Sequence, residues 1–560
     1  MYKAEWKSQA MPRDRWIVLA LILGGLLLRA YLATTAPAHA DEVIIDSRAI
    51  GIIEAQRIST IDQMPLYNWV LDSLFWAFGR GFVSGRIASV VFGALLPLLV
   101  YLLGQRFFGR QAGLLGAVLC AFSPYLLTYQ AESNTMMTFF ALLGLVLFFE
   151  GLERKQPNLF VLGFVALGLA TLIKTIALMI VVAMVLIAII QRRDMPFWYL
   201  VVGLLFYGIL VLPIISHNLI LYHQKGILDM LFIRYFPVEN NPYANLLDFG
   251  GLSIDKALLN INGLSLLGIG TDPLLSILGV VGIVLVIGTS WKRRQVHPSW
   301  KLFVVIAALS AFLLASSLMV KHYITTITLL CIFGGHVLDA KLLSEKFKIL
   351  ASVIFIAYSL VFVSPLFVKD PGIALDDLSE LLPPHSFVVA DSRIYRGAYL
   401  FPFAEHAIMG SMHFIEIEEF SLTRPPGDVV NTTIYFLECV PDDCTGAQSA
   451  KTNATVERMV ESFIRHGEVI AQVPEDDPVY RLHKSSSLLV NDGKDHSWIV
   501  GNFFFHTIGW RYPQTIIDWY VPAPGWQQML STLSLIVLWT GLALVALGII
   551  TAIILWARIR

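Results

Sequence analysis

Two adjacent carboxylates, Asp41 and Glu42, follow directly after the first long apolar run of the chain. A carboxylate within hydrogen-bond reach of a hydroxyl can take its proton as that hydroxyl attacks an electrophile. Carboxylates also bind hard cations, and most carboxylates on protein surfaces are simply hydrated. The pair is therefore a candidate catalytic base, a candidate cation ligand or two ordinary hydrated surface carboxylates. The residues that follow it in the sequence are needed to choose among these three interpretations.

Positively charged and hydrogen-bonding side chains stand where later apolar runs end. Lys174 interrupts the apolar stretch 158–191, and Lys321-His322-Tyr323 precedes another apolar run. Such donors stabilise the negative charge that accumulates on a departing phosphate, which makes these four residues candidates for phosphate binding. The alternative for the two lysines is snorkelling, in which a lysine at a helix end extends its amine to the membrane interface.

A polar segment between two apolar runs supplies three further candidates. Arg234, His217 and His223 are further candidates for binding the phosphate, and the two histidines could alternatively hold a metal ion. The spacing of the two histidines is not a familiar ligand pattern, so we assign no metal site to them. We expect no required cofactor, and a divalent metal remains an open alternative.

The composition indicates that transmembrane helices position the candidate carboxylates and phosphate-binding residues. The 560 residues are 56% hydrophobic and 14% charged, whereas a soluble domain is about one quarter charged. Apolar runs of roughly 18 to 24 residues recur about twelve times, and each is long enough to cross a bilayer core of about 30 Å. We therefore predict a mainly α, polytopic membrane protein of about twelve transmembrane helices. The net charge of −1 offers no reason to expect nucleic acid as a partner.

Alternate connections between the apolar runs are rich in Lys and Arg, which are enriched on the cytoplasmic side of membranes. This pattern predicts a multi-pass protein of the cell membrane with both termini in the cytoplasm. The first run also resembles a secretory signal, because APAHA after it looks like a cleavage site. Its length and Arg29 near its outer end favour an uncleaved first span.

The same topology divides the chain into three parts. Residues 1–368 form a transmembrane region with outer loops at about 34–82 and 216–273, and residues 527–560 form a final transmembrane helix. Between them, residues 369–526 contain short strand-like segments such as TTIYFLECV and EVIAQV, which predict a small extracytoplasmic α/β domain. If that compartment is oxidising, we expect Cys439 and Cys444 in this domain to form a disulfide.

An ordered series of motifs resembles a known family. Asp41-Glu42 is followed by QMPLYNWVLDSLFWAFG, then by SGRIASVVFGALLPLLVYLLGQRFFGRQAG and by a segment containing Ser-Pro. This order is similar to that of the protein O-mannosyltransferase and lipid A aminoarabinose transferase superfamily, whose membrane architecture is called GT-C. The resemblance covers about 1–200 and continues through GLATLIKT and KHYITTITLLCIFGGHVLD. One departure is Gln63-Met64-Pro65, because the family usually has His-Pro-Pro or Lys-Pro-Pro there, with a basic group near the phosphate.

The resemblance implies a glycosyltransferase of the GT-C type. It implies transfer of a sugar from a polyprenyl-phosphate donor to an acceptor hydroxyl on protein, lipid or glycan, at the outer face of the lipid bilayer. Asp41 corresponds to the catalytic base, and Glu42 would orient it or contact the sugar. A further acidic residue after the third span corresponds to Glu132, with Asn134 as the alternative. Lys174, Lys321, His322, Tyr323 and Arg234 would face the donor phosphate.

Two other classes of function remain as alternatives. A lipid or sugar transporter, or flippase, commonly contains internally repeated halves, which this sequence does not display. A membrane-anchored assembly subunit would not need so many spans before its outer domain. We therefore expect a transferase, with the transporter as the second hypothesis and the assembly subunit as the third.

Overall fold

The computed structural model describes most of the transmembrane region and parts of the segment that follows it. The described residues are 12–36, 42, 45, 49, 51–59, 65–128, 133–192, 196–229, 232, 272–316, 320–340, 343–367, 375–383, 386–391, 394, 407–410, 429–441, 467–490 and 521–559. Three predicted site residues lie outside these ranges, namely Asp41, Glu132 and Arg234. Gln63 and Met64, which depart from the family motif, also lie outside them.

Seven of the described helices are long and apolar enough to cross a bilayer. They are α1 (Pro12–Thr35), α4 (Phe82–Phe108), α7 (Ser133–Arg154), α10 (Phe197–Lys225), α12 (Pro273–Arg293), α15 (Glu345–Val363) and α22 (Trp526–Ala557). The chain is therefore a mainly helical, multi-pass membrane protein, as predicted.

Five apolar helices are shorter than these. They are α5 (Arg110–Phe122), α8 (Pro157–Ile173), α9 (Leu178–Ile190), α13 (Trp300–Ser316) and α14 (Ile324–Leu338). Short helical pieces accompany them: α3 (Pro65–Phe78), α6 (Pro124–Thr128), α16 (Leu375–Glu380), and the 3-10 turns η1 (Thr175–Ala177), η4 (Val320–Tyr323) and η5 (Ser364–Phe367). The expected total of about twelve transmembrane helices stays a prediction, because these five are short for a full bilayer crossing.

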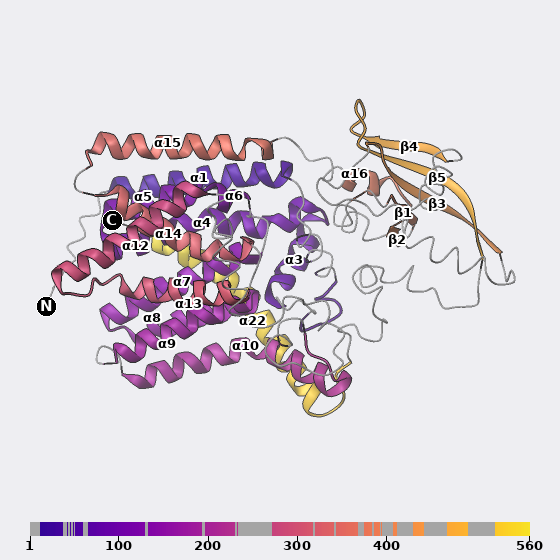
Figure 1. Cartoon of the computed structure of the whole chain (residues 1–560). Coiled ribbons are helices and arrows are strands. Elements are labelled where there is room, and N and C mark those ends of the chain that lie inside the picture. The colour runs from indigo at the N-terminus through magenta and orange to yellow at the C-terminus, as the bar shows by residue number, and fades with distance from the viewer. Residues whose placement is uncertain are drawn as a thin grey trace.

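The helices form one bundle, and a small β-sheet lies beyond one end of it (Figure 1). We call this end the sheet end and the opposite end the far end. Ion pairs at the far end join the starts of α1 and α5 through Asp14 and Arg110, and the ends of α4 and α7 through Arg106 and Glu153. α1 therefore ends toward the sheet end, where α4 and α7 begin. α10 also ends toward the sheet end (Figure 1).

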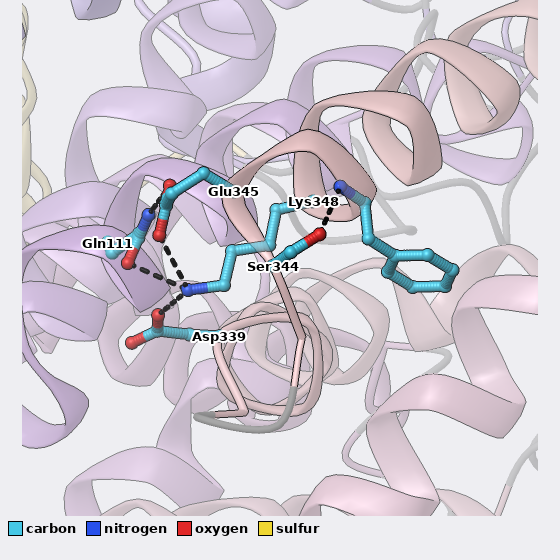
Figure 2. Close-up of polar contacts among 6 residues, drawn as sticks. Gln111, Asp339, Ser344, Glu345 and Lys348 are labelled. Carbon is cyan, nitrogen blue, oxygen red and sulfur yellow. Dashed lines mark hydrogen bonds and ion pairs between the residues drawn. The ribbon is translucent and has the colours of Figure 1, made fainter.

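A polar cluster at the far end fastens α15 to its neighbours (Figure 2). The amine of Lys348 lies 2.9 Å from Asp339, which follows α14, and 3.2 Å from Glu345. It also donates to the side-chain oxygen of Gln111 in α5, at 2.9 Å. One ammonium group therefore links three helices, and Ser344 caps the start of α15 by accepting from the backbone N–H of Phe347.

Small residues allow close contact between α5 and α14 in the bundle core. A Cβ atom added at Gly335 of α14 would lie 2.3 Å from the carbonyl oxygen of Ala112 and 2.8 Å from the Cα of Gly116. Such contacts between small residues bring helix backbones together inside membranes, where packing rather than water drives association.

The helical path is interrupted at Ser123, between α5 and α6. The buried carboxylate of Asp272 joins this interruption to the start of α12. Asp272 is fully buried and caps α12, since its Oδ1 accepts from the backbone N–H of Leu275 at 3.2 Å. Its Oδ2 accepts from the hydroxyl of Ser123 at 2.6 Å. Asp272 thus satisfies polar groups that a helix start and a helix break would otherwise leave unpaired in an apolar interior.

The sheet contains β1 (Phe387–Ala390), β2 (Ala407–Gly410), β3 (Val429–Cys439), β4 (Glu468–Val473) and β5 (Tyr480–Val490) in the order β2-β1-β3-β5-β4. β1 pairs in parallel with β2 and β3, and β5 is antiparallel to β3 and β4. In the register, Leu437 lies opposite Leu482, and both are fully buried. Cys439 is disulfide-bonded, and its expected partner Cys444 lies outside the described residues.

We expect Asp272→Ala to lower the free energy of unfolding by about 2 kcal/mol, because a helix cap and the partner of a buried hydroxyl are lost together. Asp272→Asn keeps one acceptor oxygen for the helix cap, and its amide NH2 can donate to the oxygen of the Ser123 hydroxyl, so it should lose less than half as much. Thermal unfolding in detergent compares the two variants, and equal losses would show that hydrogen bonding by this side chain is not what stabilises the break.

Candidate functional site

A buried ion pair joins the segment after α1 to the helix bundle. The Nε atom of Arg86 in α4 lies 2.5 Å from Oε1 of Glu42, and its Nη2 lies 3.0 Å from Oε2. Both side chains are almost completely buried, at 2% and 3% exposure for the whole residues. The planar guanidinium thus holds the carboxylate of Glu42 by two parallel hydrogen bonds, the strongest geometry for such a pair.

Arg86 also holds the chain that leads into this loop. Its Nη1 donates to the carbonyl oxygens of Ala33 at 2.9 Å and Ala36 at 2.8 Å. One side chain therefore binds the end of α1 and Glu42 together. Asp41 lies outside the described residues, but it directly precedes Glu42 in the sequence, so the chain on both sides of the predicted base is tied to α4.

Glu42 has a carboxylate that is committed to Arg86. Each of its two oxygens accepts a hydrogen bond from that guanidinium. Of the two roles expected for Glu42, orienting its neighbour fits this contact better than contact with the sugar.

The next part of the loop is attached to α3. The carboxylate of Asp72 accepts from the backbone N–H groups of Gly51 and Ile53, each at 2.9 Å. The indole of Trp69 donates to the carbonyl of Arg57 at 3.0 Å and packs edge-on against Trp539 of α22. These contacts hold the loop segment 51–57 on a helix at the sheet end, which gives the candidate site a rigid base.

The predicted phosphate-binding residues lie on helices that point toward the same end. α7 runs from the sheet end to the far end and α8 returns, so Lys174, which follows α8, lies toward the sheet end. His322 and Tyr323 lie in η4, just before α14, whose other end adjoins Asp339 at the far end. Lys321 belongs to the same turn. Among the described contacts, none joins these residues to Glu42 or Arg86.

Tyr323 has a feature suited to ligand binding. Its side chain is fully buried, yet its hydroxyl has no hydrogen-bond partner among the described residues. A buried hydroxyl without a partner is energetically costly, so a ligand oxygen would satisfy it.

Sequence reasoning did not select Arg86 for the site, although a signal was present. A charged residue inside a long apolar run is costly in a membrane and for that reason indicates a function or a partner. The same holds for Arg29, which is fully buried in α1, donates to the carbonyl of Ala121 at 3.3 Å and lies against Gly93. The partners of both arginines are distant in sequence and become visible only in the fold.

The two histidines of the polar segment turn to different surroundings. His217 is buried within α10, whereas His223 contacts Gln527 of α22 at 3.0 Å and lies edge-on to Trp526. In the part of the chain that the structure describes, no group of three or more His, Cys, Asp or Glu residues is placed to hold a metal ion. Asn134, the alternative to Glu132, is buried at the start of α7.

Residues 62–220 match the family model described as dolichyl-phosphate-mannose-protein mannosyltransferase. Over this segment the chain is therefore similar to that family of mannosyltransferases. The matched segment runs from the end of the first outer loop through α10 and includes Arg86 and Lys174. At the level of the family, the expectation of a glycosyltransferase that uses a polyprenyl-phosphate sugar is confirmed. No curated protein matches the chain significantly.

The fold of the chain is similar to that of solved ArnT structures. ArnT from Cupriavidus metallidurans bound to undecaprenyl phosphate aligns with a TM-score of 0.56 at 12% identity, over 84% of this chain and 97% of that chain. The apo state of ArnT aligns with a TM-score of 0.55 at 13% identity, over 85% and 98% of the two chains. An Archaeoglobus fulgidus oligosaccharyltransferase has a TM-score of only 0.45 at 13% identity, over 69% and 62%. The ArnT likeness shows the architecture of nearly the whole transferase chain.

We expect Arg86→Gln to lower the free energy of unfolding by about 3–5 kcal/mol, because it leaves the carboxylate of Glu42 buried without its cation. The double variant Arg86→Gln with Glu42→Gln removes both charges and should lose less. Arg106→Gln is the matched control, since its partner Glu153 is 38% exposed and a pair of that kind contributes about 1 kcal/mol or less. Thermal unfolding in detergent measures all three, and an Arg86→Gln protein as stable as the control would contradict the anchoring role.

Proposed function

We propose that this chain transfers a sugar from a polyprenyl phosphate to an acceptor hydroxyl at the sheet end of its helix bundle. The observation that carries this proposal is the buried contact between Arg86 and Glu42, which ties the segment bearing Asp41 to a helix inside the family-matched region. The likeness to ArnT, solved with undecaprenyl phosphate, supports the same class of donor.

The reaction is a single displacement at the anomeric carbon. The acceptor oxygen attacks that carbon while Asp41 takes the hydroxyl proton, so the nucleophile becomes more reactive as the bond forms. The bond between the anomeric carbon and the phosphate oxygen breaks, and polyprenyl phosphate departs with the electron pair. Attack opposite the leaving group inverts the configuration at the anomeric carbon. Glu42 orients Asp41, and Glu132, which directly precedes α7 in the sequence, is the further carboxylate of the site.

The leaving phosphate needs positive charge and hydrogen-bond donors in the transition state. Lys174, Lys321, His322 and Arg234 supply the charge, and Tyr323 donates a hydrogen bond to a phosphate oxygen. The support for Tyr323 is its buried hydroxyl, which has no partner in the described part of the chain. The acceptor is a hydroxyl of a protein, a lipid or a glycan, and the domain over 369–526 positions it.

The sheet end faces outward from the cytoplasm, and both termini are cytoplasmic. Basic residues support this orientation, since Arg106, Arg110, Arg154 and Lys155 all belong to helix ends or turns at the far end. Lysine and arginine are enriched on the cytoplasmic side of multi-pass membrane proteins. The donor lipid therefore presents its sugar at the outer surface of the cell membrane.

We expect Asp41→Asn to lower the rate of sugar transfer about 100-fold to 10,000-fold, because the amide cannot accept the acceptor proton. The assay uses the full chain in liposomes with a panel of radiolabelled polyprenyl-phosphate sugars, and donor binding is measured on the same samples. Glu153→Gln, a 38% exposed carboxylate at the far end of α7, is the control and should retain full activity. A wild-type protein that moves the donor lipid across the bilayer without releasing sugar would instead support a transporter.

We expect Tyr323→Phe to raise the KM for the donor about tenfold to a hundredfold, since a hydrogen bond to a charged phosphate is lost. Tyr207→Phe is the control, because the Tyr207 hydroxyl already lies 3.3 Å from the hydroxyl of Thr171 in the protein interior. Steady-state kinetics with varied donor concentration separates KM from kcat. Unchanged donor KM in Tyr323→Phe would remove this residue from the phosphate site.

A further inference from the structure

A groove opens between α12 and α13 at the far end of the bundle, away from the candidate site. Its volume is about 360 Å³, and its lining is mostly apolar, including Ile283, Val286, Ile287, Phe303 and Phe333. Val286 and Phe333 are buried at its base, whereas Ile287 is 50% exposed and Phe303 is 41% exposed. In a membrane protein, apolar side chains exposed at a spanning helix face lipid chains, so the groove is open to the bilayer.

Aromatic residues mark the depth of the groove in the membrane. Trp291 and Trp300 both line it, and Trp291 is 85% exposed. Tryptophan is enriched where acyl chains meet headgroups, because its ring is apolar and its N–H remains able to bond to water or lipid oxygen. The groove therefore begins at the interface and extends along the acyl-chain region.

Three consecutive basic residues stand beside the groove. Lys292 and Arg293 end α12, and Arg294 follows as its C-cap and lines the groove. All three are exposed, and the segment 291–300 contains no Asp or Glu. Burial, and then the nearby positive charge of Arg293, lower the pKa of His297, which also lines the groove. The charge of Arg293 thus acts at the groove itself.

The acidic residues at this end are already engaged. Asp339 and Glu345 are both paired with Lys348, as Figure 2 shows. Within the described ranges, Lys292, Arg293 and Arg294 form no ion pair with a carboxylate. The positive charge beside the groove therefore remains available to an anionic ligand.

We propose that this groove binds an anionic glycerophospholipid, with an acyl chain between α12 and α13 and the phosphate against Lys292, Arg293 and Arg294. The apolar lining, the interfacial tryptophans and the uncompensated charge each match one part of such a lipid. Basic pockets between transmembrane helices on the cytoplasmic side are suited to anionic headgroups. The bound lipid joins α12 to α13 at the end where a short loop connects them. This binding is independent of sugar transfer.

Native mass spectrometry of the full chain with phosphatidylglycerol or phosphatidylcholine tests the proposal. The charge variant Lys292→Gln/Arg293→Gln/Arg294→Gln should bind phosphatidylglycerol about tenfold to a hundredfold more weakly, since each basic residue near an anionic lipid contributes roughly fivefold. The control variant Arg154→Gln/Lys155→Gln/Arg192→Gln removes three basic residues from other helix ends and should bind as the wild type does. Ile287→Trp fills the groove and should also weaken binding.

The outcomes separate the alternatives. Weaker binding in both the charge variant and Ile287→Trp, with no change in the control, supports the site, provided that the thermal unfolding of the variants shows a folded protein. A loss in the charge variant alone would overturn the groove as the acyl-chain site. Equal binding of phosphatidylcholine would overturn the selection for negative charge. Undecaprenyl phosphate is added as a competitor in the same experiment. If it displaces phosphatidylglycerol at a lower concentration than phosphatidylglycerol itself needs to bind, the groove binds a polyprenyl lipid and the proposal for a glycerophospholipid is overturned.

Discussion

A charge in a membrane interior is stable only where another charge or a set of hydrogen bonds replaces the water that it has lost. Arg86 meets this condition through Glu42 and through the carbonyl oxygens of Ala33 and Ala36. Because all three partners belong to the end of α1 or the chain beyond it, satisfying one guanidinium also determines where the first outer loop begins. Asp41, the predicted base, directly precedes Glu42 in the sequence, so the pairing of the Arg86 guanidinium also limits where Asp41 can lie.

The same physical requirement gives the two ends of the bundle different character. At the far end, Lys348 and Arg110 are paired with acidic groups, and these contacts join helices at the membrane surface. Toward the sheet end, the unsatisfied hydroxyl of Tyr323 and the committed carboxylate of Glu42 lie near segments expected to receive the donor. Paired polar groups therefore join segments at both ends, and the hydroxyl of Tyr323 differs from them in having no partner among the described residues.

The family match and the fold likeness support the functional proposal at different levels. The match over 62–220 concerns the sequence of the region between the first outer loop and α10. The alignment with ArnT, at 12% identity, concerns the architecture alone but extends over most of the chain. Together they support the proposal of a sugar transferase from two independent sides, one from sequence and one from fold.

The sequence by itself determined the class of protein, the approximate helices and the order of the motifs. The sequence could do so because the length of an apolar segment and the Lys and Arg content of its flanking loops are local properties, and these properties govern how a segment inserts into a bilayer. Only the tertiary structure decided that Glu42 binds Arg86, that Asp272 joins α12 to Ser123, and that His223 contacts Gln527 of α22. These pairings connect residues far apart in the chain, and a buried polar group takes whichever partner the helix packing brings within hydrogen-bond distance.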